Sequence, residues 1–260
     1  ELLDWLATEF AWDWDVKRLH RLIVTSGAYR QSSRVRPDHR AKDPGNRLLA
    51  RAPRLRIPSF FLRDLALSVS GLLDPRIGGK PVYPYQPAGI WDGLAITKER
   101  DFTYPQSTGR DLYRRSLYTF WRRTAAPGNL FDSANRQQCT VDQPRTSTPL
   151  HALTTLNDTT WTEASRVLAA RALAEAPPVR AAVGRMARRI LARPLAPAET
   201  DALMRVYGAA LAHYARHAAD ADALLRTGAA PPPADRRTET AALTQVALAL
   251  FNLDEALTRE

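Results

Sequence analysis

The sequence predicts a mainly α-helical protein: a multi-helix domain with long irregular loops in its middle and a helical bundle at its C-terminal end. Three observations lead to this prediction. Apolar residues recur at the spacing of one helix face over much of the first seventy residues. Helix-starting signals divide the chain after Pro149 into five helical segments. Between these regions, five prolines and the Gly78-Gly79 pair exclude a long helix over residues 74–109.

The N-terminal region is predicted to contain three helices. The first has an apolar face made of Leu2, Leu3, Leu6 and Phe10. The second starts near Asp13 or Asp15, either of which could cap it, and runs to Ser26. A polar stretch extends to Asn46. The third helix is amphipathic and follows Pro58.

The middle of the chain is predicted to be irregular over residues 74–109. This segment carries aromatic rings among its prolines: Tyr83, Tyr85, Trp91, Phe102 and Tyr104. A loop of this length in a compact domain is usually functional or tightly packed. Gly78-Gly79 is interpreted as a turn, because no glycine-rich phosphate-binding motif surrounds it. For residues 111–123, which are rich in aromatic residues and arginine, helix and strand are open alternatives.

The C-terminal part is predicted to be helical near residues 149–155, 158–175, 178–192, 197–218 and 236–256. Asp158 is a candidate helix cap, and Pro197 is typical of a first helical turn. Residues 228–233 are proline-rich and predict a linker between the last two helices. We expect a helical and long-loop region over 1–148 and a helical region over 149–260, together forming one continuous domain. The sequence starts in mid-helix at Glu1, which suggests a piece of a longer protein.

The composition limits the possible partners and cofactors. The net charge of +10 permits an anionic partner. However, only four of the 37 basic residues are lysine, and such an excess of arginine is expected from a GC-rich genome. The basic residues are also spread along the chain rather than gathered in one block. Both observations make nucleic acid a poor candidate for the partner. No apolar run is long enough to span a bilayer. The single cysteine, Cys139, excludes an internal disulfide and a Cys-x-x-Cys-His haem attachment, so no cofactor is predicted within this chain.

Ten short strings, taken in order, resemble one protein family. They lie at residues 25–33 (Thr-Ser-Gly-Ala-Tyr-Arg-Gln-Ser-Ser), 46–49, 63–64, 70–74, 78–79, 84–87, 113–121 (Tyr-Arg-Arg-Ser-Leu-Tyr-Thr-Phe-Trp), 148–150, 156–158 and 252–255. Together they resemble the planctomycete-type domain of unknown function that lies C-terminal to cytochrome c-like modules. The sequence departs from that pattern at Phe60, where an acidic residue is common, at Ser147 and at His151.

The resemblance implies a setting rather than a reaction. Such proteins are typically exported to the periplasm or cell surface, often carry a c-type haem domain upstream, and occur in genomes rich in polysaccharide-degrading enzymes. Upstream domains of the same protein and acidic polysaccharide are therefore the expected partners. No reaction is established for the family, so the resemblance does not say whether this chain is an enzyme.

One candidate site consists of Asp132, Arg136, Cys139 and Arg145. Arg145 and Arg136 could bind an oxyanion through their planar guanidinium groups. Cys139 could act as a nucleophile if a nearby arginine lowered its pKa. The alternative, which we favour for Cys139, is that it is a small buried apolar residue; Asp132 and Arg136 would then form an ion pair that fixes the loop.

A second candidate site lies in the aromatic and arginine-rich middle segments, at Tyr85, Trp91, Tyr104, Arg114 and Trp121. The rings could stack on sugar faces while guanidinium groups bind acidic substituents. The same residues could equally form a packed plug over a core, with their polar atoms hydrogen-bonded.

A weaker candidate is a metal site at His213 and His217. They are four residues apart on a predicted helix, which places both imidazoles on one face, and Asp220 follows three residues later. Tyr214 stands where the metalloprotease pattern requires glutamate. The more ordinary interpretation is an exposed pair on a helix surface, so no metal is predicted.

These observations favour one function and leave two alternatives. The favoured function is that of an accessory module of an exported, haem-associated protein that contacts polysaccharide or another anionic ligand. The first alternative is an enzyme that uses Asp132, Arg136 and Cys139. The second is a structural domain that docks the upstream modules.

Overall fold

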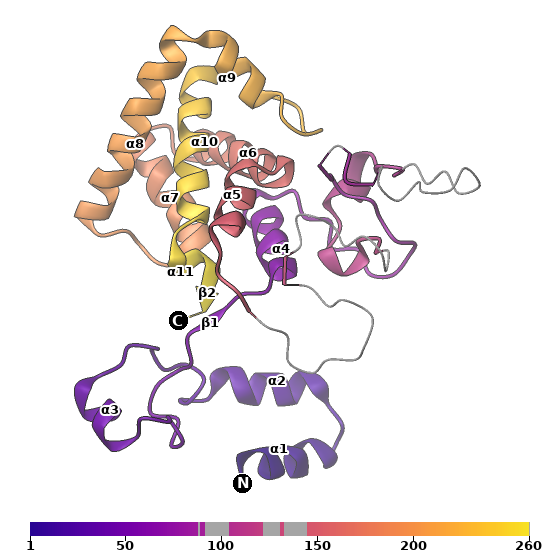
Figure 1. The fold of residues 1–260 in the computed structure, drawn as a ribbon, viewed down its shortest axis with the longest axis vertical. Helices are drawn as coiled ribbons and strands as arrows, with labels where there is room; N and C mark the ends of the chain where they lie inside the picture. Colours follow the sequence, from indigo (N-terminus) through magenta and orange to yellow (C-terminus); the bar gives the residue numbers. More distant parts are fainter. Residues whose placement is uncertain (88, 92–103, 122–130, 133–144, 260) are drawn as a thin grey trace. The chain divides into compact units, whose positions relative to one another are not determined.

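The computed structural model describes residues 1–87, 89–91, 104–121, 131–132 and 145–259 (Figure 1). The chain divides into two compact units. Unit 1 comprises Glu1–Leu55 with Thr258–Glu260, and unit 2 comprises Arg56–Leu257. The prediction of a mainly helical protein with an irregular middle is confirmed: over the described residues helices dominate, and β1 (Leu55–Arg56) and β2 (Thr258–Arg259) pair in the only sheet.

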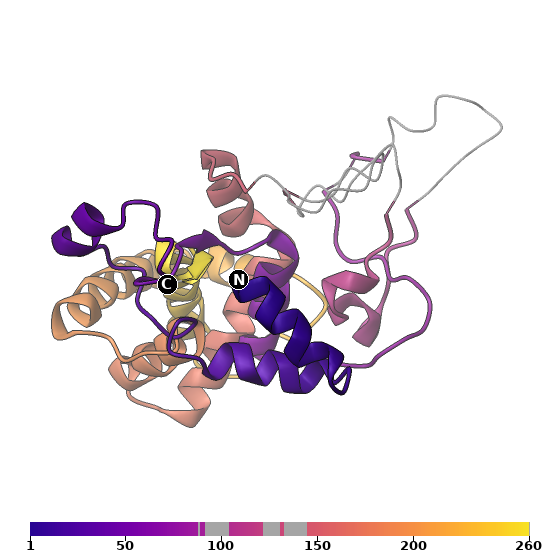
Figure 2. The ribbon, with the colours of Figure 1, turned by 90° about the horizontal axis from the view of Figure 1, so that it is seen from below.

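Unit 1 contains α1 (Leu2–Ala11), α2 (Val16–Thr25) and the short α3 (Pro37–Lys42). The first two pack against each other as a helical hairpin (Figure 2). The polar stretch before Asn46 therefore contains a helix that was not predicted, and Pro37 occupies its first turn.

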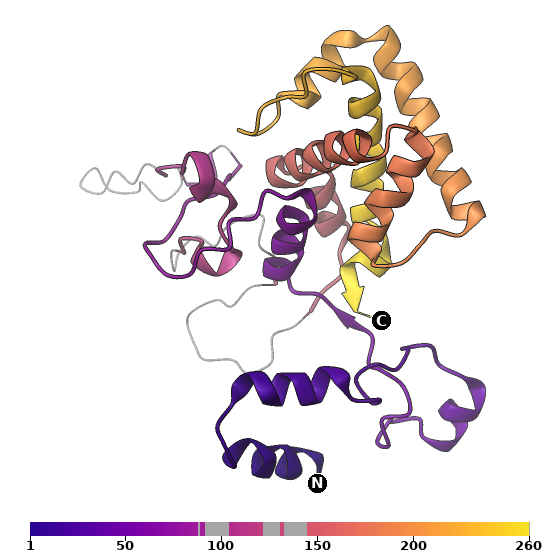
Figure 3. The ribbon, with the colours of Figure 1, turned by 180° about the vertical axis from the view of Figure 1, so that it is seen from behind.

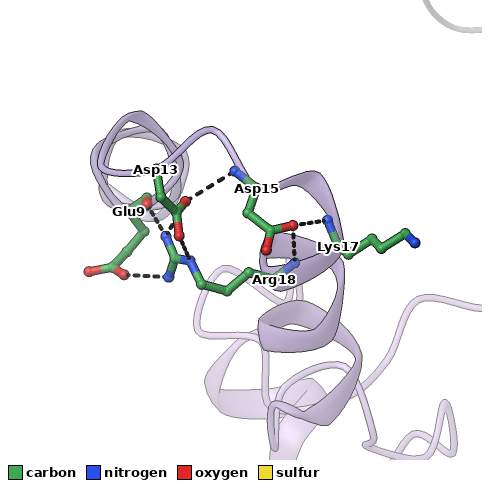
Figure 4. Close-up of polar contacts among 5 residues, drawn as sticks. All are labelled: Glu9, Asp13, Asp15, Lys17 and Arg18. Atoms are coloured by element: carbon green, nitrogen blue, oxygen red, sulfur yellow. Dashed lines mark hydrogen bonds and ion pairs between the residues drawn. The ribbon is translucent and has the colours of Figure 1, made fainter.

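The corner between α1 and α2 is held by capping and by one arginine (Figure 4). Of the two candidate caps, it is Asp15 that caps α2, because its Oδ1 accepts the backbone N–H groups of Lys17 at 2.9 Å and Arg18 at 3.1 Å. The Arg18 side chain donates back to Asp13 Oδ2 at 2.6 Å and to Glu9 Oε2 at 3.3 Å. Arg18 thus joins the end of α1 to the start of α2.

Unit 2 is a bundle built around α10 (Arg237–Phe251), which packs on α6 and α8 (Figure 3). Its other helices are α4 (Ser59–Ser70), α5 (Pro149–Asn157), α6 (Thr159–Glu175), α7 (Val179–Leu191), α8 (Pro197–Arg216), α9 (Ala218–Leu225) and α11 (Asp254–Leu257). Side chains on all faces of α10 are buried, as expected for a central helix. None of the helices in the described ranges combines the length and apolar character needed to cross a membrane.

Helix boundaries in unit 2 follow the predicted signals, with two differences. Asp158 caps α6 by accepting the backbone N–H of Thr160 at 2.9 Å, and Pro197 is in the first turn of α8. The helix predicted over 197–218 is α8, which ends at Arg216 because His217 leaves the helical conformation with φ −128° and ψ 67°; α9, which follows it, was not predicted. The helix predicted over 236–256 also ends early, at Phe251, and α11 follows as a separate turn.

The predicted linker at 228–233 is fixed to α6 by two buried charged side chains. Glu163 Oε1 accepts the Ala230 N–H at 2.6 Å. Arg166, 1 % exposed, donates from Nε to the Thr227 carbonyl at 2.7 Å and from Nη1 to the Pro231 carbonyl at 3.1 Å. The two side chains also lie 3.6 Å apart as an ion pair. Several backbone groups of this loop are thus paired although they belong to no helix or strand.

We expect Gly228→Ala to destabilise the protein and Gly208→Ala to stabilise it. Gly228 has φ +83°, and a Cβ there would lie 2.2 Å from the carboxyl carbon of Glu163. Strain and displacement of a buried carboxylate should lower the free energy of unfolding by about 1–3 kcal/mol. Gly208 lies within α8 with open space around it, so alanine should raise the free energy by about 0.5–1 kcal/mol. Urea denaturation of both variants measures the two changes in the free energy of unfolding. Equal effects would contradict the packing of Gly228 on Glu163.

Candidate anion-binding site

Two irregular segments of unit 2 run side by side, and the candidate site lies on them. Isolated parallel bridges join Asp74 to Arg114 and Val82 to Thr119. The Asp74 N–H donates to the Tyr113 carbonyl at 3.0 Å, and the Val82 N–H donates to the Tyr118 carbonyl at 2.8 Å. Residues 74–82 are therefore positioned by 113–119. The second segment is neither α-helix nor β-strand; its regular parts are the short 3₁₀ turns η2 (Gly109–Tyr113) and η3 (Ser116–Tyr118).

Helix α4 positions the second segment through an adjacent arginine and aspartate. Arg63, 2 % exposed, donates to the Leu112 carbonyl at 2.8 Å and to the Arg114 carbonyl at 2.9 Å. Asp64 Oδ1 accepts both the N–H and the Oγ–H of Ser116, each at 2.7 Å. Burial lowers the pKa of Arg63, and the nearby Asp64 carboxylate partly offsets this effect. Four polar groups of the 3₁₀ turns are thus hydrogen-bonded to side chains of α4, and these bonds fix the position of the turns.

The first segment is held in turn by Arg114 and Tyr118. Arg114 Nη2 donates to the Arg76 carbonyl at 3.0 Å and to the Gly78 carbonyl at 2.6 Å. Its guanidinium carbon lies 4.1 Å from the ring centroid of Tyr118, whose hydroxyl accepts the Gly78 N–H at 2.7 Å. The φ angles of Gly78 and Gly79 are +79° and +95°, a region that favours glycine. The Gly-Gly turn thus curves around the guanidinium of Arg114.

This turn borders an open cavity of about 430 Å³. Its charged lining residues are Arg76, Lys80, Arg114 and Asp111, three cations against one carboxylate. Arg76 donates to Asp111 Oδ1 at 2.7 Å and to the buried Asp74 carboxylate at 2.8 Å. These bonds raise the pKa of Arg76 and fix its position. Lys80 is exposed and forms no ion pair within the described part of the chain, so its charge is available to a ligand.

The rings proposed as a sugar platform pack largely on protein groups. Trp91 is buried and stacks on Tyr104, with centroids 5.0 Å apart and planes at 21°. Tyr85 is also buried; its hydroxyl accepts the Ala229 N–H at 2.8 Å, and burial raises its pKa to about 12. Trp121 stacks on Phe60 at 6.0 Å. Of the residues predicted for this site, only Arg114 lines the cavity.

The described residues of the other predicted sites do not line this cavity. Both Asp132 carboxylate oxygens are engaged by Thr146, Oδ2 by its N–H at 2.7 Å and Oδ1 by its hydroxyl at 2.8 Å. Arg145 is exposed, while Arg136 and Cys139 lie outside the described residues. His213 and His217 are at the junction of α8 and α9.

Sequence reasoning missed the other charged residues of the cavity: Arg76, Lys80 and Asp111. A signal was present, since Arg76 and Lys80 flank the Gly78-Gly79 pair. The pair was interpreted as a plain turn because no glycine-rich phosphate-binding motif surrounds it. The partner segment, almost forty residues later, cannot be identified from sequence spacing.

The chain matches a protein family over most of its length. The model of the family PSD1, described as a protein of unknown function (DUF1553), matches residues 1–207, which include the whole cavity. No curated protein and no solved structure matches the chain.

We expect Arg114→Lys to loosen the Gly-Gly turn although it keeps the charge. Lysine cannot reproduce a planar guanidinium that donates to two carbonyls while stacking on Tyr118. The free energy of unfolding should fall by about 1–2 kcal/mol in urea denaturation. Arg205→Lys, on the exposed surface of α8, is the matched control and should change it by less than about 0.5 kcal/mol. Equal stability of the two variants would show that Arg114 does not hold the turn.

Proposed function

Because the chain belongs to the PSD1 family, whose function is unknown, we propose a function from the site itself: the cavity beside Gly78-Gly79 binds an acidic polysaccharide. The observation that carries the proposal is the pairing of a preformed cavity with an excess of positive charge. Three cationic side chains and one carboxylate line it, and the charge of Lys80 is not neutralised by a described neighbour.

The dimensions and chemistry of the cavity support a sugar carrying sulfate or carboxylate groups. A volume of about 430 Å³ is within the range of ligand sites, roughly 300–1,000 Å³. Ammonium and guanidinium groups bind such anions through charge-assisted hydrogen bonds. Asp111 can accept hydrogen bonds from sugar hydroxyls, and its carboxylate selects against ligands that are charged at every position.

The rigid construction of the site also supports ligand binding. Arg114 and Arg76 are held by hydrogen bonds to backbone carbonyls or carboxylates before any ligand arrives. A binding group that is already fixed loses little conformational entropy when the ligand binds. The cavity thus has two fixed cations and one exposed lysine that can adjust to the ligand.

We infer the setting of this module from the resemblance to planctomycete-type domains. It would be exported and would accompany a c-type haem domain of the same protein, with the neighbouring domains as its partners. Reading the gene upstream of the codon for Glu1 tests this inference. A signal peptide followed by a Cys-x-x-Cys-His codon string would support it, whereas a frame that encodes neither would remove it.

We expect Lys80→Ala to weaken the binding of a sulfated oligosaccharide about fivefold, the loss of one exposed charge contact of about 1 kcal/mol. Isothermal titration calorimetry measures the dissociation constant against the sulfated sugar and against its unsulfated parent. Raising the salt concentration should weaken binding of the sulfated form, because mobile ions screen exposed charges. The unsulfated parent should bind more weakly at every salt concentration.

The matched control for this experiment is Arg205→Ala, which removes an equal charge from α8. It should bind the sulfated sugar as the unmodified protein does. If the folded protein bound no member of a panel of acidic sugars, or if both variants lost the same affinity, the cavity would not be the binding site.

A further inference from the structure

The junction of α8 and α9 brings together three side chains that can bind metal ions. His213 is in the last turn of α8, His217 is the residue between the helices, and Asp220 is in the first turn of α9. One ligand atom from each residue lies within 4.8 Å of the other two. All three residues are exposed. They also lie beyond residues 1–207, the part that the family model matches.

The backbone determines which nitrogen of His217 can bind a metal. Its Nδ1 lies 3.0 Å from the His213 carbonyl oxygen. A carbonyl only accepts hydrogen bonds, so Nδ1 carries the proton in the neutral ring, and the lone pair is on Nε2. Histidine ligands in metal sites are commonly oriented in this way, by a hydrogen bond from the second nitrogen to a carbonyl or carboxylate. His217 is therefore preset to bind through Nε2.

The other two ligands are already close together. His213 Nε2 lies 3.0 Å from Asp220 Oδ2, and the rings of His213 and His217 stack with centroids 4.6 Å apart. Metal–nitrogen bonds of about 2.0–2.1 Å in a tetrahedral site place the ligand atoms roughly 3.3 Å apart. All three side chains are exposed, so they are free to rotate toward this spacing.

We propose that His213, His217 and Asp220 form a binding site for a divalent transition-metal ion such as Zn²⁺. Two imidazoles and one carboxylate suit Zn²⁺ and its neighbours better than Ca²⁺ or Mg²⁺, which take oxygen ligands. Three protein ligands leave a fourth position for water or a ligand. The ion would bridge two helices at the point where the chain leaves the helical conformation, and it would stabilise that corner.

The site is tested by titrating the tag-free 260-residue chain with ZnCl₂ in calorimetry and by recording thermal unfolding with and without the ion. We expect one ion per chain and a higher melting temperature when the site is saturated. His213→Ala and His217→Ala should each weaken Zn²⁺ binding at least about tenfold and abolish the thermal shift. Co²⁺ in place of Zn²⁺ should give visible absorption bands typical of tetrahedral coordination.

The matched control is His20→Ala, which removes an exposed histidine from α2 and should bind Zn²⁺ as the unmodified chain does. Lys80→Ala should also bind Zn²⁺ normally, so the result is independent of the anion-binding proposal. Equal affinities in the His213, His217 and His20 variants, or no saturable binding by the folded chain, would overturn the site. His213 and Asp220 would then form only an ion pair that joins α8 to α9.

Discussion

The irregular parts of unit 2 depend on one interaction, the donation of hydrogen bonds from buried arginine side chains to backbone carbonyls. Chain outside helices and strands leaves carbonyl groups unpaired, and burying them without partners costs free energy. Arg63 satisfies carbonyls in the 3₁₀ turns, Arg114 does so in the Gly-Gly turn, and Arg166 in the loop before α10. A guanidinium suits this use because it offers five donors in a rigid plane.

This interaction changes the meaning of the +10 charge. Taken from the sequence, the excess of arginine suggested either an anionic partner or a bias of the genome. Within the described residues, three arginines are buried and engaged with the protein itself, so they contribute to the fold as well as to the net charge. An exposed cation that no described residue pairs with, such as Lys80, keeps its whole charge for a partner. Net charge alone could not separate these two groups.

The helices could largely be predicted from sequence, whereas the site could not. Apolar spacing and the caps at Asp15 and Asp158 are local signals, and they predicted α2, α4 and α6 well. The break at His217 has no such signal, since neither glycine nor proline marks it. The cavity depends on contacts between residues almost forty positions apart, and its key acceptors are carbonyls, which every residue has. Residue type therefore cannot identify them.

The arginine and lysine side chains around the cavity have different roles, which follow from their chemistry. Arginine binds several fixed acceptors at once, which makes it suitable for building the turn, and the buried Arg114 does this. Lysine is a compact, strongly hydrated charge on a flexible chain, which suits it to contact with a ligand that arrives from water. Only four lysines occur in the whole chain, and one of them is in this cavity. The cavity thus combines a rigid turn, which Arg114 holds in place, with the mobile charge of Lys80. Both depend on α4, because Arg63 and Asp64 hold the segment that carries Arg114.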